Sequence, residues 1–224
     1  MGIISVENTD RLYWLGRYTE RVYSTIKTFE TRFDSMLDLD DLKYAEFCKS
    51  QDIPNIYESR EDFCERYCFS REDENSIFSN LMRAYDNAIV LREEVGSDTL
   101  SYIQLAVYAM KQAAVSNSPL IGLQKVTDNI AAFWGMVDDA IDEAQIRDTI
   151  KVGKLIERID LYARLKETPE KLRREARRLT DRIDRSTMRY SKKTLAHVNY
   201  LVQLDDLPYE TLIESVENLV GDDV

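Results

Sequence analysis

Apolar residues recur at alternating spacings of three and four near the start of the chain, which is typical of a helix that packs along its length. The positions that carry this pattern are Leu12, Leu15, Thr19, Val22, Ile26, Phe29, Phe33 and Met36. They predict one long helix over residues 7–37. The next stretch, residues 38–74, is acidic, irregular and interrupted by a proline after Ile53, so we expect only short helices there.

The remaining chain shows further helical segments between start signals. Helical spacing covers residues 75–95, and three further helices begin near Ser97 as an N-cap and near Pro119 and Pro169 as first helical residues. Another helix is predicted over residues 146–166, and an amphipathic stretch lies near the C-terminus. Each of these segments fits an antiparallel arrangement with short connections.

The fold class follows from what the chain lacks as well as from its spacing. No segment alternates apolar and polar residues like a strand for more than a few positions. Seven glycines and four prolines are few for 224 residues, of which 32% are charged. We therefore predict an all-α fold: a single domain over residues 1–224, an antiparallel bundle of about seven helices.

A glycine-glutamate motif occurs twice, as Gly-basic-x-x-Glu-Arg-aliphatic. It runs from Gly16 to Val22 and again from Gly153 to Ile159. Helical side chains lean toward the N-terminus, so each glutamate lies over the turn that holds the glycine. A helical glycine costs about 1 kcal/mol relative to alanine. We expect each glycine to form a notch for a neighbouring helix or for the glutamate's partner, and the two motif helices to pack centrally.

The charged residues of the two motifs can form one polar centre. Adjacent helical positions point about 100° apart, so the arginine beside each glutamate needs a partner from elsewhere. Antiparallel packing about a pseudo-twofold axis would place Glu20 against Arg158. It would likewise place Glu157 against Arg21. Each glutamate also has a basic residue three positions before it as a local partner: Arg17 and Lys154.

This predicted centre has two interpretations. In the structural one, the charges satisfy each other and fix the register of two helices, although buried ion pairs are poor stabilisers. In the functional one, the carboxylates and arginines line a cavity that binds a polar ligand or performs acid–base chemistry. Glu20 and Glu157 are then the candidate catalytic residues.

The charge balance limits the classes of partner. The net charge is −11 and the isoelectric point is near 4.8, which argues against general nucleic-acid binding. The sequence has neither an apolar run long enough for a membrane span nor the features of a signal peptide at its start, so we expect a cytoplasmic protein without membrane association.

Metal and cofactor sites are not expected. The three cysteines, Cys48, Cys64 and Cys68, and the single histidine, His197, do not have the spacing of a zinc site. The chain also has no Glu-x-x-His pair of the di-iron type and no glycine-rich phosphate loop. We therefore predict no metal and no cofactor.

Residues 170–193 form a basic stretch within this acidic chain. They include ten Lys or Arg and four Asp or Glu, and their apolar residues keep helical spacing. One interpretation is an amphipathic helix with a solvated basic face. The other is a docking surface for an acidic partner, for RNA, or for the acidic residues 34–74 of this chain.

Three blocks of the sequence resemble the alpha-E domain family of bacterial proteins. They are "VENTDRLYWLGRYTERVYST" (residues 6–25), "NAIVLREEVGSDTLSYI" (residues 87–103) and "AAFWGMVDDAIDEAQIRDTIKVGKLIERIDLYARL" (residues 131–165). The resemblance adds Asn87 and Arg92 to the candidate polar residues. The chain departs from the family pattern at Ile89 and Lys154, where the family has arginine.

The resemblance also implies a functional context. Members of this family occur beside or fused to circularly permuted ATP-grasp proteins and near transglutaminase-like peptidases, which suggests amide-bond formation on a peptide or small metabolite. We therefore expect an accessory or substrate-binding helical domain that works with an ATP-grasp-type amide ligase, with a transglutaminase-like protein as a second partner. The alternatives are an enzyme that uses the paired Glu and Arg residues, and a structural module that forms a homo-oligomer.

Overall fold

The computed structural model describes residues 5–38 and 43–221, and of residues 30–38 it describes the backbone alone. The predicted apolar positions Phe33 and Met36 therefore lie outside the described side chains. The described residues contain no strand, only an isolated bridge between Tyr190 and Val220. The predicted all-α fold is confirmed.

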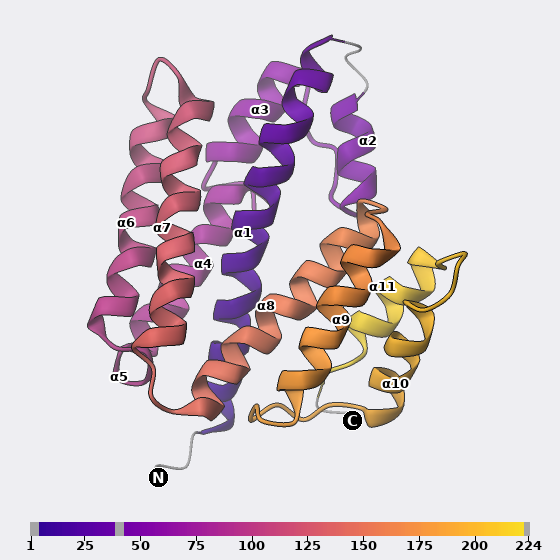
Figure 1. The fold of residues 1–224 in the computed structure, drawn as a ribbon. Coiled ribbons are helices and arrows are strands. Elements are labelled where there is room, and N and C mark those ends of the chain that lie inside the picture. The colour runs from indigo at the N-terminus through magenta and orange to yellow at the C-terminus, as the bar shows by residue number, and fades with distance from the viewer. Residues whose placement is uncertain (1–4, 39–42, 222–224) are drawn as a thin grey trace. The chain divides into compact units, whose positions relative to one another are not determined.

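The described residues form eleven helices (Figure 1). They are α1 (Val6–Asp38), α2 (Lys43–Ser50), α3 (Arg60–Phe69), α4 (Ile77–Val90), α5 (Arg92–Val95), α6 (Ser97–Ala114), α7 (Pro119–Asp139), α8 (Ala144–Arg164), α9 (Pro169–Ile183), α10 (Lys192–Leu201) and α11 (Tyr209–Glu217). Both motif-bearing helices, α1 and α8, lie close to their predicted bounds.

The predicted number of about seven helices is too low, because it leaves out the short helices α2 and α3 of the acidic stretch and because two segments contain breaks that the apolar spacing does not reveal. The backbone leaves helical geometry at Leu91, which separates α4 from the single turn of α5. The basic stretch likewise ends its helix at Ile183, and a new helix starts where the Ser191 side chain accepts a hydrogen bond from the Thr194 amide. Side-chain capping of this kind satisfies backbone donors at a helix start.

The chain divides into two compact units. Unit 1 comprises Met1–Arg17 and Asp142–Val224, and unit 2 comprises Tyr18–Ile141. The boundary falls inside α1, between Arg17 and Tyr18. Unit 1 therefore contains the first turns of α1 with α8 to α11, and unit 2 contains the rest of α1 with α2 to α7. The single domain over residues 1–224 stays a prediction.

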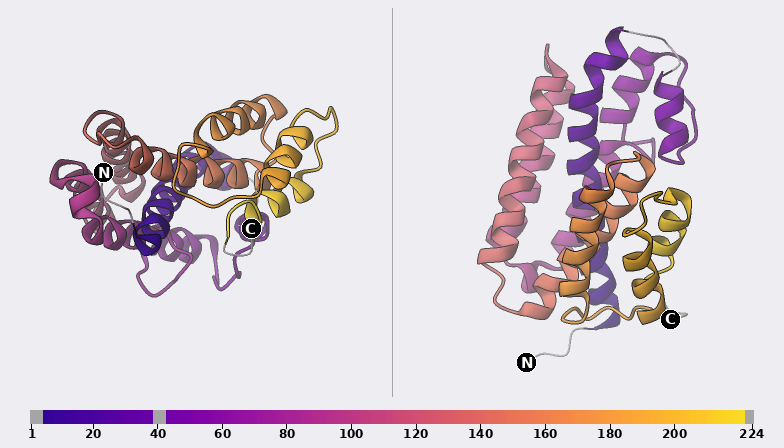
Figure 2. Two further views of the ribbon diagram at one scale, coloured as in Figure 1. Left: turned by 90° about the horizontal axis from the view of Figure 1, so that it is seen from below. Right: turned by 45° about the vertical axis from the view of Figure 1, so that its right-hand side comes forward.

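Unit 2 is built around a long helical hairpin. α6 and α7 run side by side, α4 packs against α6, and α3 packs against α4 (Figures 1 and 2). The acidic stretch forms the short helices α2 and α3, and these helices and the segment between them contribute an aromatic cluster to the core. The ring of Phe63 lies 5.0 Å from the ring of Tyr57 and 5.0 Å from that of Tyr67, between ring centroids. Such aromatic contacts stabilise a core beyond the area that they bury.

Unit 1 is organised around α8, which packs against α9 and α11, while α10 packs against α11 (Figure 2). Leucine, isoleucine, valine and alanine side chains from all four helices form one buried cluster, for example Ile156, Ile159, Leu179, Val198 and Leu212. Burial of such side chains from water is the main stabilising contribution to a helical core. α8 thus lines one side of this core.

The two motif glycines lie where α1 and α8 meet in unit 1. A Cβ atom added to Gly16 would lie 2.0 Å from the carbonyl oxygen of Ile150, and one added to Gly153 would lie 2.1 Å from that of Tyr13. Each glycine therefore faces the carbonyl of the residue three positions before the other glycine. The contact is reciprocal, and it joins backbone to backbone in the manner of Cα–H···O contacts between helices.

A methyl group at either position would force the helices apart, because the atom that it meets is backbone. We expect Gly153→Ala to lower the free energy of unfolding by about 3 kcal/mol, despite the higher helix propensity of alanine. Gly135 on α7 is the control, since a Cβ there meets nothing within 4 Å. Gly135→Ala should stabilise by up to about 1 kcal/mol. Urea denaturation followed by circular dichroism measures both, and an equal effect of the two substitutions would contradict the contact.

Candidate functional site

The close approach of α1 and α8 brings the charged residues of the motifs together in unit 1. Arg17, next to Gly16, donates through Nε to Oε2 of Glu157 at 2.7 Å. The Glu157 side chain is 0% exposed and that of Arg17 is 12% exposed. Arg17 also donates through Nη1 to the Tyr13 hydroxyl at 3.3 Å. The two motifs thus share a buried ion pair between helices.

Electrostatics at this pair favour the charged form of the arginine. Burial alone would lower the pKa of Arg17, but the carboxylate of Glu157 and, more weakly, Tyr13 and Asp160 raise it above its ordinary value. Burial raises the pKa of the Tyr13 hydroxyl, although the positive charge of Arg17 opposes this. The guanidinium carbon also lies 5.2 Å from the centroid of the Trp14 ring, within range of a cation–π contact. Arg17 is therefore a fixed positive charge.

The charge network continues along α8 to α11. Asp160, three residues after Glu157, accepts hydrogen bonds from Arg164 Nε at 3.0 and 3.1 Å. Arg164 also donates through Nη2 to Glu217 Oε1 of α11 at 2.6 Å. Burial raises the pKa of Asp160 above its ordinary value, as does the negative charge of Glu157, while Arg164 opposes the shift. Sequence analysis missed Asp160 and Arg164, although their i, i+4 spacing is a recognised ion-pair signal.

Glu20 and Arg21 of the first motif lie in unit 2. Glu20 is fully buried, and its Oε1 accepts a hydrogen bond from Ser24 Oγ at 2.7 Å, one turn further along α1. Burial raises the pKa of Tyr67 on α3, and the positive charge of Arg21 opposes this shift, so Arg21 lies near that hydroxyl. The predicted pairings of Glu20 with Arg158 and of Glu157 with Arg21 stay predictions.

The other predicted residues have local roles. Arg92 is exposed and donates through Nε to Ser97 Oγ at 3.0 Å, at the start of α6. Asn87 is half-buried near the end of α4, where its carbonyl accepts from the Leu91 amide. Lys154 is half-buried on α8, and its backbone nitrogen lies beside Gly16. Arg92 and Asn87 belong to unit 2 and Lys154 belongs to unit 1.

Arg158 of the second motif turns toward α9. Its Nη1 lies 3.6 Å from Oε2 of Glu175, whose side chain is 0% exposed. Arg174 donates through Nε to Glu175 Oε1 at 2.9 Å, and Arg178 donates through Nη1 to both carboxylate oxygens at 3.2 Å. Arg174 and Glu175 are adjacent in sequence and pair because the long arginine side chain bends back to its neighbour.

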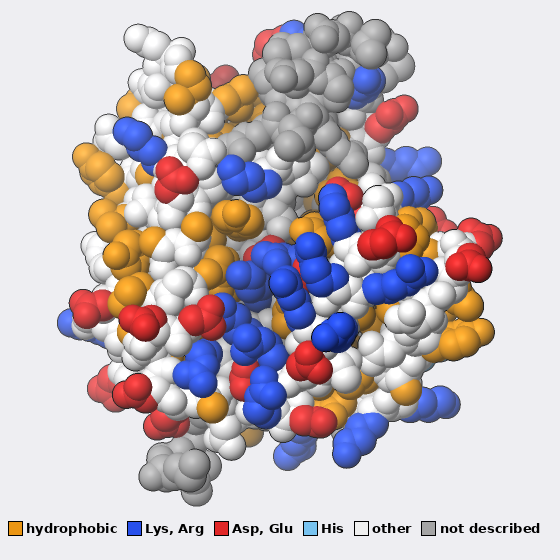
Figure 3. Space-filling model, in the orientation of Figure 1, with side chains coloured by type: hydrophobic (Ala, Val, Ile, Leu, Met, Phe, Trp, Pro, Cys, Tyr) orange, Lys and Arg blue, Asp and Glu red, His pale blue; other side chains and the backbone are white. Residues whose placement is uncertain are grey.

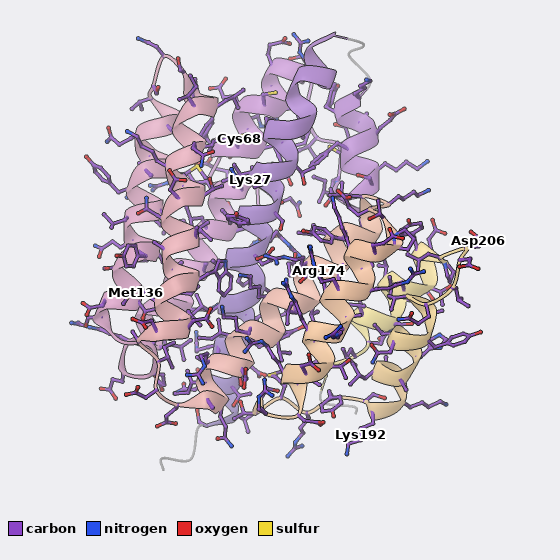
Figure 4. All side chains as sticks on the ribbon, in the orientation of Figure 1. Lys27, Cys68, Met136, Arg174, Lys192 and Asp206 are labelled. Carbon is purple, nitrogen blue, oxygen red and sulfur yellow. The ribbon has the colours of Figure 1, made fainter. Side chains whose placement is uncertain are left out.

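A second buried carboxylate binds the far end of the basic stretch. Asp148 of α8 accepts hydrogen bonds from Arg182 Nη1 at 2.5 Å and from Arg185 Nε at 2.8 Å. Sequence analysis missed both Asp148 and Glu175, since neither has a motif of its own. Lys and Arg side chains gather over α8 and α9 (Figure 3), and Arg174 lies among them (Figure 4).

The described residues also bear on metals and membranes. Among the described side chains, those of residues 5–29 and 43–221, no three His, Cys, Asp or Glu lie close enough together to hold a metal ion. In the same part of the chain, no helix has both the length and the apolar character that crossing a bilayer requires. The cytoplasmic location stays a prediction.

The comparison with known families matches most of the chain. Residues 8–188 match the model of the Alpha-E family, described as a predicted alpha-helical domain with a conserved ER motif. The chain therefore belongs to the Alpha-E family. No curated protein and no solved structure matches it. The matched residues include both Glu-Arg pairs of the motifs and end before α10 and α11.

The ion pair between Arg17 and Glu157 should show strong energetic coupling, because either charge alone would remain buried without its partner. We expect Arg17→Met and Glu157→Gln each to lower the free energy of unfolding by about 3 kcal/mol. The double variant should lose less than the sum, with a coupling of at least about 1 kcal/mol.

The exposed pair between Glu7 and Arg11 on the same helix is the matched control for this cycle. Glu7→Gln and Arg11→Met should show coupling near zero, since solvent screens that pair. Urea denaturation of all the variants gives both couplings. Equal couplings for the buried and the exposed pair would contradict the assignment.

Asp160 should make stability depend on pH in a direction opposite to that of an ordinary paired carboxylate. Its folded-state pKa lies above its unfolded value, so it favours the folded state at low pH and loses this contribution as pH rises through that interval. Asp160→Asn removes the effect. Stability of the variant relative to the parent protein should therefore increase between about pH 4 and pH 7. Urea denaturation across this range tests it, and a constant or decreasing difference would contradict the raised pKa.

Proposed function

We propose that this Alpha-E protein is a noncatalytic partner of an ATP-grasp-type amide ligase and binds the peptide substrate of that ligase. The functional context comes from the resemblance of the three sequence blocks to the family. The site supports the proposal because the best acid–base candidate in unit 1 has no access to solvent. A role in binding therefore needs fewer assumptions than a role in catalysis.

The observation that carries the proposal is the state of Glu157. Its side chain has no exposed area, and Oε2 accepts a hydrogen bond from Arg17 at 2.7 Å. A general base must reach the proton that it removes, directly or through one water. A carboxylate that is sealed and held by a fixed positive charge is suited to positioning helices. Arginine side chains on α9, by contrast, remain accessible to a ligand.

An enzymatic role is the second candidate, and the raised pKa of Asp160 favours it. A carboxyl group that is protonated more readily than usual can act as a general acid, and perturbed groups concentrate at functional sites. Asp160 is nevertheless buried and held through both oxygens by Arg164. Burial and the neighbouring negative charge of Glu157 account for the raised pKa without a catalytic role.

The test is the activity of an ATP-grasp-type ligase from the same organism as this protein, measured as ADP release with a peptide substrate. Adding the parent protein should lower KM of the ligase for the peptide by at least about fivefold, while the protein alone should release no ADP. Asp160→Asn should stimulate as well as the parent protein does, since binding needs no acid. Loss of turnover in this variant would support the enzymatic candidate, and no effect of the parent protein on the ligase would refute the partnership.

A further inference from the structure

A row of arginines follows one face of α9. Arg174, Arg178 and Arg182 are spaced four residues apart, and Arg185 continues the row just beyond the helix end. Positions four apart lie on the same side of a helix, about 6 Å apart along its axis. α9 lies in the region of unit 1 where basic side chains gather in Figure 3, and Figure 4 labels Arg174 there. It is therefore an ordered line of positive charge.

Buried carboxylates bind these arginines on the side that faces the protein interior. Glu175 binds Arg174 and Arg178, and Asp148 binds Arg182 and Arg185, with carboxylate side chains 0% and 3% exposed. A buried anion that fixes the guanidinium groups reduces the entropy that they would lose on binding a ligand. Arg158 also lies 3.6 Å from Glu175, so five arginines share these two carboxylates and the net charge of the group is positive.

The outer side of the row is accessible to solvent. The side chains of Arg174, Arg178 and Arg185 are 56%, 54% and 56% exposed. An arginine has five N–H donors, and Arg174 bonds Glu175 only through Nε, while Arg178 bonds it only through Nη1. The outer N–H groups of both guanidinium groups can therefore donate to a ligand.

Three more carboxylates lie on this segment and limit where an anion can bind. Asp184 accepts a hydrogen bond from the Tyr190 hydroxyl and Asp181 lies near Arg185, so both are close to the C-terminal end of α9. Glu170 lies in the first turn of α9, where Arg173 offsets its charge at 3.8 Å. The first part of the row, at Arg174 and Arg178, is therefore the more positive end.

We propose that this row binds an extended acidic peptide, with carboxylates at alternate residues meeting successive guanidinium groups. An extended chain rises about 3.3 Å per residue, so alternate side chains lie about 6.6 Å apart, close to the spacing of the arginines. Guanidinium and carboxylate groups also form geometrically matched, charge-assisted hydrogen bonds. The inference concerns this surface alone and does not depend on the ligase.

The overall charge favours a short peptide over a nucleic acid. At a net charge of −11, the protein repels a long polyanion whose phosphates extend beyond the row. A short peptide with carboxylates at alternate residues places its charge along the arginines. The contact should weaken as salt is added, because the row is partly exposed to solvent.

The experiment measures binding of a fluorescein-labelled octapeptide of alternating glutamate and serine, by fluorescence anisotropy at low salt. The double substitution Arg174→Gln with Arg178→Gln should raise Kd at least about tenfold, because charge-assisted hydrogen bonds are lost. The control is Lys192→Gln with Lys193→Gln, which removes two positive charges from exposed positions on α10. Figure 4 labels Arg174 and Lys192 on their separate helices. The control should change Kd by less than about twofold.

A second double variant keeps the test valid if the double glutamine variant unfolds because buried Glu175 has lost two of its partners. Arg174→Lys with Arg178→Lys keeps both charges but loses the planar guanidinium groups. Its Kd should lie between those of the parent protein and the double glutamine variant. Thermal unfolding checks each variant. Equal weakening by the α10 control, absence of binding by the parent protein, or equally tight binding of an all-serine peptide would each overturn the proposal. Tighter binding of an eight-residue oligothymidylate would overturn it in favour of a nucleic acid.

Discussion

The backbone contact between α1 and α8 at Gly16 and Gly153 is the constraint on which unit 1 depends. Side chains normally keep packed helices 8–10 Å apart, whereas here each glycine faces a carbonyl oxygen of the other helix. That approach brings Arg17 to Glu157 and seals the carboxylate from solvent. The repeated glycine, unfavourable in an isolated helix, is therefore explained by what it allows the two helices to do.

Two buried acids of unit 1 share one arrangement, in which a carboxylate lies inside and an arginine from another helix binds it. Glu157 with Arg17 joins α8 to α1, and Asp148 with Arg182 joins α8 to α9. Such pairs contribute little net stability, because both charges lose their hydration, but they penalise a shifted register. Asp148 also binds the exposed Arg185, and buried Glu175 binds the exposed Arg174 and Arg178. The internal network therefore also shapes the surface proposed to bind an acidic peptide.

The sequence predicted features that depend on local spacing and missed those that depend on long-range packing. The long first helix was predicted over residues 7–37 and spans Val6–Asp38, because an apolar stripe on one helix face is a local property. The repeated motif directed attention to Gly16 and Gly153 for the same reason. Glu175 and Asp148 carry no such pattern. Their importance arises only when α9 folds back along α8, and the sequence alone does not determine which arginine meets which acid.

The most direct measurement of the reciprocal glycine contact is a nuclear Overhauser effect experiment on the parent protein. A Cβ position on Gly16 lies 3.0 Å from the backbone nitrogen of Lys154, and one on Gly153 lies 3.2 Å from that of Arg17. Cross-peaks should therefore connect a Gly16 Hα proton with the Lys154 amide proton and a Gly153 Hα proton with the Arg17 amide proton. Absence of both cross-peaks in a folded, assigned spectrum would contradict the close approach of the two helices.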